Sequence, residues 1–307
     1  MNTNRSDTGV LLGCLCALGC ELMFGLSYLF TKDATGTASP LALLGWRFAV
    51  AALTIGGCAA VGLVKLRLRG KSLKPLLRVA LCSPIAYFVG ETYGIRLTTA
   101  AESGAFLACI PVASIVASAL LLKKKPTRRQ VVGILITFAG VLVAVLAAGI
   151  EARLSVVGYA MLVLAMAAYA LYGVSVEKAR DFSGAEVTFA MLMTGAVVFA
   201  PAAVAEAVAE GTLPALLALP FRDAGFARAV LYLGVGSSVF AFFLSNVALA
   251  RIGVNRTSSF IGVATAVAIL AGMFILHEPF SPLQLVGAAM IVCGVYVANS
   301  GKNKLNG

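Results

Sequence analysis

Gln130-Val131-Val132-Gly133, followed by Gly140-Val141, returns later in the chain as Gln284-Leu285-Val286-Gly287, followed by Gly294-Val295 at the same spacing. The match extends upstream, where Lys125-Pro126 corresponds to Glu278-Pro279 and residues 103–107 (SGAFL) correspond to residues 257–261 (TSSFI). The offset is 154 residues for the outer blocks and 153 at the prolines, so one small insertion separates the copies. The sequence therefore predicts an internal duplication, with residues 1–150 as the first repeat (helices 1 to 5) and residues 151–307 as the second (helices 6 to 10).

The composition of the 307 residues predicts that lipid solvates this chain. Hydrophobic residues make up 60% and charged residues 12%, and the mean hydropathy is +0.97. That leaves too little polar surface to cover a soluble domain. Ten apolar stretches are long enough to cross roughly 30 Å of hydrocarbon: 9–31, 41–64, 78–97, 101–122, 130–149, 154–176, 187–206, 226–250, 255–276 and 283–300.

These stretches are evenly apolar and show none of the alternation that a barrel strand requires. We therefore expect an all-α polytopic membrane protein with ten transmembrane helices. Stretch 9–31 could be read as a signal peptide, but Glu21 interrupts it. In addition, residues 24–27 (FGLS) resemble residues 172–175 (YGVS) of the second repeat, so the stretch is kept as helix 1. The longest connection, 207–225, contains two prolines and is expected to hold no folded domain.

The distribution of the basic residues predicts the orientation. If the N-terminus is cytoplasmic, the inner segments hold 18 of the 24 Lys and Arg residues and the outer segments hold five, while Arg47 lies within helix 2. Such a bias favours a multi-pass protein of the cell (inner) membrane with both termini cytoplasmic. Because each copy has an odd number of helices, the second copy is upside down relative to the first, giving a five-plus-five inverted repeat.

The net charge of +11 does not indicate nucleic-acid binding. The basic runs 65–78 and 123–129 are expected to lie against anionic lipid headgroups. The seven cysteines all fall in predicted helices, and an odd number of apolar thiols argues against a disulfide framework. We expect neither a metal site nor a cofactor, and no ATP-binding loop of the form GxxxxGK[ST] occurs.

Three charged residues inside the predicted spans are the first candidates for function, because a charge near the bilayer centre costs about 2.5 to 3.5 kcal/mol. They are Glu21 in helix 1, Arg47 in helix 2 and Glu91 in helix 3. Helical spacing places Glu21 with Gly25 and Tyr28 on one face, and Glu91 with Tyr87 on another. Both faces are typical of a wet cavity wall.

Two interpretations of these charges stay open. In the first, Arg47 pairs with Glu91 or Glu21 and merely locks helices together. In the second, the carboxyl left over carries a proton or binds a substrate amine.

Other residues could line a substrate path or allow it to move. Tyr169, Tyr172 and Asn246 could stack on or hydrogen-bond a solute, although tyrosines also serve in helix packing. Pro84 and Pro111 free backbone carbonyls and are candidate hinges. The glycines at 133, 140, 287 and 294 are expected to pack helix 5 against helix 10.

The chain resembles the EamA-type branch of the drug/metabolite transporter superfamily along essentially its whole length. The residues that carry the resemblance are the segment 24–28 (FGLSY) with Lys32, Pro40 before Trp46-Arg47-Phe48, 98–101 (TTAA) with Pro111, and the run from Glu278-Pro279 through Gly287 to Gly294-Val295. The resemblance implies ten helices, cytoplasmic termini, and a central path lined by helices 1 to 4 and 6 to 9. The chain departs from the family pattern at one position. Family members often carry an acidic residue there in both copies, whereas this chain has Lys125 in the first copy and Glu278 in the second.

The resemblance implies a secondary transporter, most often an exporter, that moves a small-molecule substrate such as an amino acid or drug-like solute by alternating access. Proton coupling and a monomeric or homodimeric state are compatible with it. A membrane-embedded enzyme acting on lipid-type substrates is the first alternative, although the predicted spans contain no Asp. A passive channel is the second. The sequence leaves the substrate, the coupling ion, the direction of transport and the oligomeric state open.

Overall fold

Helices form almost all of the protein. The computed structural model describes residues 3–97, 107, 109–147, 155–275 and 282–299, and no strand occurs among them. The helices of the first repeat are α1 (Thr3–Thr37), α2 (Pro40–Ala60), α3 (Lys74–Ala80), the π-helix η1 (Leu81–Ala86), α4 (Tyr87–Leu97), α6 (Ile110–Leu121) and α7 (Arg128–Ala147).

The second repeat has the same order with additions. Its helices are α8 (Val156–Lys178), α9 (Gly184–Ala209), α10 (Leu213–Arg222), α11 (Ala224–Leu231), the π-helix η2 (Tyr232–Ala241), α12 (Phe242–Ile252), α13 (Val254–Ser258), α14 (Gly262–Ile275) and α15 (Pro282–Asn299). The third predicted helix of each repeat is thus a succession of helical pieces around a π-helix. This internal likeness reflects the duplication.

Small polar residues set the starts of several helices. Ser39 precedes Pro40 and accepts a hydrogen bond from the Ala42 amide at 3.0 Å, and Ser155 caps α8 in the same way. Ser183 and Glu186 form a reciprocal capping box at the start of α9. These caps satisfy amides that lipid could not hydrogen-bond.

Five helical stretches among the described residues are long and apolar enough to cross a membrane. They are Thr8–Thr37, Pro40–Ala60, Val156–Lys178, Gly184–Ala209 and Ala224–Ile252. Shorter apolar helices accompany them at Ile110–Leu121, Leu213–Arg222 and Leu285–Ala298. Large apolar side chains point outward, among them Leu53, which is 78% exposed. Such a surface fits a protein whose solvent is lipid.

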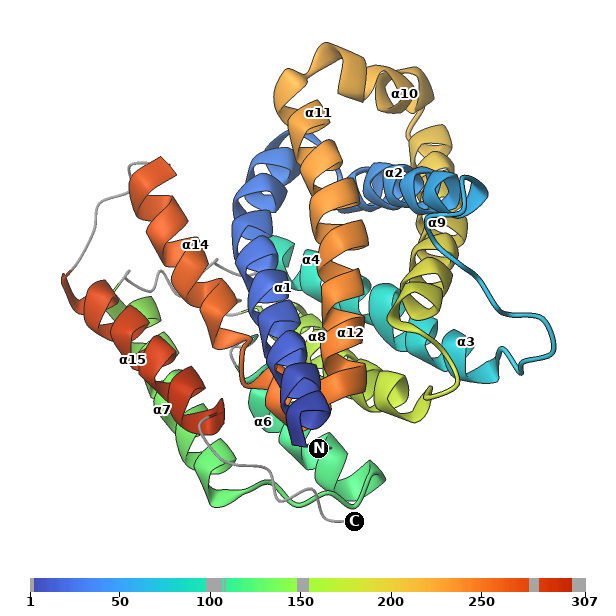
Figure 1. Ribbon diagram of the computed structural model, residues 1–307. Coiled ribbons are helices and arrows are strands. Elements are labelled where there is room, and N and C mark those ends of the chain that lie inside the picture. Colours follow the sequence, from blue (N-terminus) through green and yellow to red (C-terminus); the bar gives the residue numbers. More distant parts are fainter. Residues whose placement is uncertain (1–2, 98–106, 108, 148–154, 276–281, 300–307) are drawn as a thin grey trace.

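The contacts between helices follow the internal duplication, so that each contact has a counterpart in which the two repeats are exchanged. Helix α1 contacts α12 and α14, and its counterpart α8 contacts α4 and α6. Helices α2 and α9 pack together, as do α7 and α15, which lie side by side at one edge of the bundle (Figure 1). Exchanging the repeats maps each of these contacts onto another. The fold is an all-α inverted repeat of five plus five transmembrane segments, as predicted.

The structure adds a helix to one connection and divides one predicted span. The connection 207–225, for which no folded domain is expected, contains α10, whose Leu216 is buried against Ala203 and Ala207. Pro214 lies in the first turn of α10, where proline is tolerated. The ninth predicted helix is also not continuous, because a turn at 259–261 separates α13 from α14.

The expected packing of helix 5 against helix 10 is confirmed. A Cβ atom added at Gly140 of α7 would lie 2.7 Å from the Gly287 carbonyl oxygen of α15, and one added at Gly294 would lie 2.6 Å from the Gly133 carbonyl oxygen. Only glycine allows backbones to approach this closely. Because lipid supplies no hydrophobic drive between helices, this contact rests on close packing.

We predict that Gly140→Ala lowers the stability of the purified protein by about 1–3 kcal/mol, because the added methyl group overpacks the α7–α15 contact. Thermal unfolding in detergent measures the effect. Gly57→Ala is the matched control, since a Cβ at Gly57 meets nothing within 4 Å. Equal melting temperatures for the two variants would contradict the packing described here.

Candidate functional site

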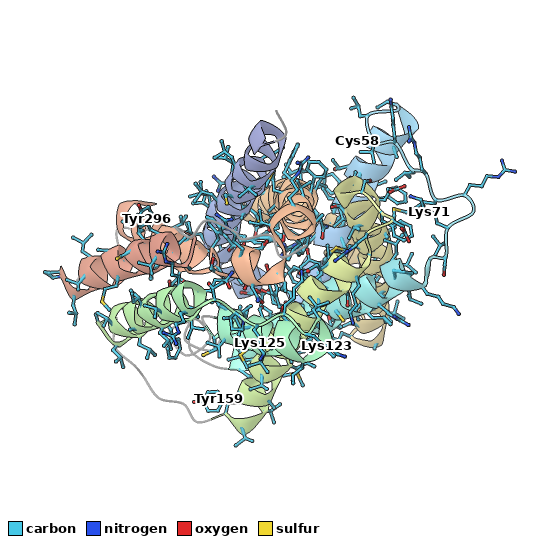
Figure 2. The ribbon with its side chains drawn as sticks, turned by 60° about the horizontal axis from the view of Figure 1, so that its bottom comes forward. Cys58, Lys71, Lys123, Lys125, Tyr159 and Tyr296 are labelled. Atoms are coloured by element: carbon cyan, nitrogen blue, oxygen red, sulfur yellow. The ribbon has the colours of Figure 1, made fainter. Side chains whose placement is uncertain are left out.

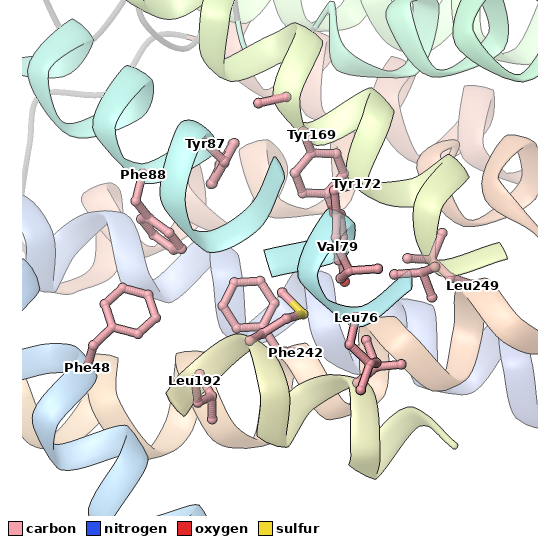
Figure 3. Packing of buried hydrophobic residues seen from close by; sticks show 14 of the residues in the cluster. Phe48, Leu76, Val79, Tyr87, Phe88, Tyr169, Tyr172, Leu192, Phe242 and Leu249 are labelled. Carbon is pink, nitrogen blue, oxygen red and sulfur yellow. The ribbon is translucent and has the colours of Figure 1, made fainter. Parts of the chain in front are cut away.

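A chain of aromatic rings runs through the centre of the bundle, where helices of both repeats meet. The ring of Tyr172 lies 5.5 Å from that of Tyr169, which lies 5.3 Å from Tyr87 (Figure 3). Tyr87 then contacts Phe88 at 5.1 Å, and Phe88 contacts Phe48 at 5.4 Å. We call these five residues the central aromatic cluster. The mostly edge-to-face geometry is the arrangement that aromatic pairs prefer.

Arg47 lies beside this cluster and is 5% exposed. Its Nε donates a hydrogen bond to Ser238 Oγ and its Nη2 donates one to Ser237 Oγ, both at 2.9 Å. The guanidinium carbon lies 4.4 Å from the centre of the Phe88 ring. These contacts join α2 to η2 and α4, and they hold the guanidinium in one orientation.

The expectation that Arg47 forms an ion pair with Glu91 or Glu21 is wrong. No described acid lies within 4.0 Å of its guanidinium nitrogens. The π-helical turn of η2 instead brings two serine hydroxyls to the guanidinium. Glu91 has another partner, since its Oε1 accepts a hydrogen bond of 2.6 Å from the Tyr87 hydroxyl. The charges of Arg47 and Glu91 still interact through space.

Glu21 is buried in the middle of α1, with 3% of its surface exposed. No hydrogen bond or ion pair joins its carboxylate to another described residue. Cys20, Tyr169 and Tyr172 lie close enough to interact with it electrostatically. A buried carboxylate without a cation is costly, so Glu21 is a candidate for carrying charge or protons.

The remainder of the predicted face of helix 1 does not form a wet wall. Gly25 packs against α14, where an added Cβ would lie 2.6 Å from the Ala264 carbonyl oxygen. Ala17, about one turn before Glu21 in α1, is buried in a separate apolar cluster with Ala248 of α12. Small residues on this face serve close helix packing rather than solvation. The side chain of Tyr28 lies outside the described residues.

A network of polar side chains lies at the Tyr172 end of the central aromatic cluster. The Tyr172 hydroxyl donates to Asn246 Oδ1 at 2.8 Å, and Asn246 Nδ2 donates to Thr188 Oγ1 at 2.9 Å. The Tyr172 hydroxyl also lies 3.4 Å from Ser245 Oγ. This network ties α8, α12 and α9 together.

Sequence reasoning named Tyr172 and Asn246 but missed their hydroxyl partners and the two serines that bind Arg47. Single Ser and Thr residues are common in transmembrane helices, so Thr188 and Ser245 carried no distinct signal. The adjacent pair Ser237-Ser238 within an otherwise apolar stretch was the one available clue.

The two candidate hinge prolines lie in different settings. Pro84 is in η1, directly after Ser83, whose φ of −144° and ψ of 124° interrupt the helix. Pro111 lies in the first turn of α6, where proline does not disturb the helix. All seven cysteines are free. Among the described residues, no group of three or more His, Cys, Asp or Glu side chains could hold a metal ion.

A ten-segment inverted repeat with buried charges at its centre defines a class of protein, the polytopic membrane transporters. The chain matches the model of the EamA-like transporter family twice, over residues 11–146 and 156–300. It belongs to this family, as the sequence motifs predicted. The protein is therefore a multi-pass membrane transporter and not an enzyme.

Similar proteins agree with this assignment. "Uncharacterized transporter YcxC" of Bacillus subtilis (strain 168) is 34% identical over 92% of this chain and 91% of its own length. A "Probable terminal-alkyne amino-acid exporter" of Streptantibioticus cattleyicolor is 26% identical over 80% of this chain and 81% of its own length. One protein of known crystal structure superposes with a TM-score of 0.75 at 21% identity, covering 93% of this chain and 97% of that one.

Proposed function

We propose that this protein is a secondary transporter that exports a small amino-acid-like or drug-like solute by alternating access. Residues 1–150 and 151–307 are the two moving repeats of this proposal. The observation that carries it is the position of Arg47, Glu91 and the central aromatic cluster at the interface between the repeats. Ligand sites of inverted-repeat transporters lie at this kind of interface. The similarity to a relative named as an amino-acid exporter supports the direction and the solute class.

The proposed orientation has both termini in the cytoplasm. The inner segments would then hold 18 basic residues and the outer segments five. Lys71, Lys123 and Lys125 are seen at the surface in the view from the end where α1 begins (Figure 2). We call this end of the bundle the basic end. On this proposal the basic end faces the cytoplasm.

A cross-repeat contact at the basic end supports alternating access. Lys124, in the connection after α6 of the first repeat, forms an ion pair with Glu177 of α8 in the second. Glu177 is 8% exposed, and it also accepts a hydrogen bond of 2.9 Å from the Val254 amide. Gly253 precedes that amide with a φ of 75° and separates α12 from α13. We call this group the basic-end latch. In the proposed cycle this ion pair would hold the cytoplasmic side closed, and it would break when solute binds.

The hinges of this motion would lie in the segments where the helices are interrupted. Ser83 and Pro84 break the third helix of the first repeat, whereas Pro111 lies in the first turn of α6 and does not interrupt it. Such interruptions lower the cost of bending a helix. Glu21 is the proposed proton carrier, because it is a buried carboxyl that lacks a described cation partner.

The proposal is tested first by transport itself. The purified protein is screened by thermal shift against amino acids, nucleosides, sugars and cationic drugs, and each hit is assayed in proteoliposomes. We expect at least one hit to be taken up with a rate that saturates as its concentration rises. Uptake that never saturates would favour a channel, and absence of uptake for every stabilising solute would overturn the proposal.

We predict that Lys124→Met, Glu177→Gln and the double variant change the transport rate by the same factor, because the interaction can be lost only once. The factor should stay below about fivefold, since Lys124 is half-exposed and such pairs contribute about 1 kcal/mol or less. Lys125→Met is the matched control and should behave as wild type. If each substitution changes the transport rate by its own factor and the two factors multiply in the double variant, the proposed latch is contradicted.

We predict that Glu21→Gln abolishes the dependence of transport on a pH gradient while the protein still folds. The amide keeps the shape of the side chain but cannot exchange a proton. Uptake is compared in proteoliposomes with and without an imposed gradient, with Glu210→Gln, an exposed acid at the end of α9, as the control. A gradient response that persists in both Glu21→Gln and Glu91→Gln would exclude both carboxyls as coupling sites.

A further inference from the structure

An open cleft lies between connections of the two repeats, away from the centre of the bundle. Its volume is about 630 Å³, within the range of about 300–1,000 Å³ that ligand sites usually occupy. One wall is the connection 61–73 between α2 and α3, and the other is the connection 179–183 between α8 and α9 with the first turn of α9. We call it the basic cleft, and its charged lining residues are Lys65, Arg67, Lys71, Arg180, Asp181 and Glu186.

Alternation along the first wall turns its basic side chains away from the core. Residues 65–68 are not helical, and apolar and basic residues alternate from 64 to 69 in step with their exposure. Successive side chains of a non-helical, extended segment point to opposite faces. Val64 and Leu68 pack against the main hydrophobic cluster, whereas Lys65 and Arg67 are exposed and line the cleft. The residues that anchor this connection thus present two cations on its other face.

Lys71 and Glu186 hold the two walls of the basic cleft together. Glu186 forms the capping box of α9 with Ser183, and its Oε1 accepts a hydrogen bond of 2.8 Å from the Arg67 backbone amide. Lys71 Nζ lies 3.4 Å from the same oxygen, and it donates a hydrogen bond of 2.7 Å to the Asp181 backbone carbonyl. The carboxylate of Glu186 is therefore already paired, and each wall is held by contacts with the other repeat.

Three other cations of the basic cleft have no acidic partner. No described acid lies within 4.0 Å of the side-chain nitrogens of Lys65, Arg67 or Arg180. All three side chains are exposed, two on the first wall and one on the second. A guanidinium binds phosphate oxygens through two parallel N–H donors, and a lysine ammonium group adds a further charge. The cleft thus offers two guanidinium groups and one ammonium group to a single anion.

We propose that the basic cleft is a binding site for a phosphate group, held by the side chains of Lys65, Arg67 and Arg180. The headgroup of an anionic phospholipid carries such a group, and so does a soluble phosphate ester. Because the three cations belong to different repeats, the bound phosphate would bridge them. The site shares no residue with the central aromatic cluster and does not depend on the proposed transport function.

The neighbourhood of the cleft favours a lipid as the carrier of the phosphate. Val61 and Leu63 follow directly after α2, one of the membrane-crossing helices, and are 72% and 77% exposed. Leu63 also lines the cleft. An apolar surface beside a group of cations suits a molecule with an anionic headgroup and apolar chains. The general field of an anionic membrane would act on every cation of this surface, whereas the cleft acts only through those that line it.

Three probes test the proposal and separate the two sources. Dioleoylphosphatidylglycerol is an anionic lipid, dioleoylphosphatidylcholine is its zwitterionic match, and glycerol 3-phosphate is a soluble phosphate ester. Binding to the full chain in detergent is followed by thermal unfolding, because the melting temperature rises with ligand concentration according to the affinity. We expect the anionic lipid to bind at least about tenfold more tightly than the zwitterionic one, which corresponds to about 1.4 kcal/mol.

Substitutions then test whether the cleft itself binds the phosphate. Arg67→Gln and Arg180→Gln should each weaken binding of the anionic lipid at least about tenfold, as expected for the loss of a hydrogen bond to a charged group. Both variants should unfold at the wild-type temperature without ligand. Arg69→Gln and Lys178→Gln are the matched controls, because these exposed cations adjoin the two walls but do not line the cleft. They should change the affinity less than about twofold, since salt screens charges outside the cleft.

The pattern of losses decides the question. Losses confined to Arg67→Gln and Arg180→Gln support the site. If they occur with the lipid alone, the phosphate comes from the membrane, and if they occur with glycerol 3-phosphate, the site also accepts a soluble ester. Equal weakening by Arg67→Gln and Arg69→Gln would show a general surface field and overturn the proposal. Equal binding of the two lipids without binding of glycerol 3-phosphate would overturn it too, as would the absence of a response to both anionic probes.

Discussion

The burial of the Arg47 guanidinium is the constraint on which the centre of this protein depends. A cation in this position must be solvated by the protein itself, because lipid provides no hydrogen bonds. Ser237 and Ser238 supply them from the π-helical segment η2 of the other repeat, and Phe88 supplies a ring face. One side chain thereby connects three helices of two repeats. It leaves the guanidinium solvated but still positively charged.

Around that centre, helices are held together by close packing, because lipid supplies no hydrophobic drive between them. Helices α7 and α15 meet through Gly133, Gly140, Gly287 and Gly294, with backbone against backbone. They pack as a pair at the edge, while the helices that surround the aromatic cluster also bury large side chains between them. The α7–α15 pair thus forms a scaffold at the edge of the bundle, and the aromatic, partly polar centre forms the candidate site. The proposed motion of the repeats would leave the scaffold pair intact.

Much of the fold could be predicted from the sequence. Apolar length located the helices, and the glycine spacing located the α7–α15 contact, because both depend on local composition. The interruptions at Ser83 and at 259–261 and the helix α10 were not predictable in this way, since tertiary contacts decide them. The same holds for the site. Helical spacing placed Tyr87 beside Glu91, but the partners of Arg47 come from a segment about 190 residues away, which no local pattern reveals.

The central claim is that the transported solute binds beside Arg47 and the central aromatic cluster, where the two repeats meet. A structure of the protein determined with a solute that it transports tests it most directly. The account predicts that the bound solute contacts the Arg47 guanidinium or the rings of the central aromatic cluster. A ligand bound elsewhere, with Arg47 still held only by Ser237, Ser238 and Phe88, would contradict it.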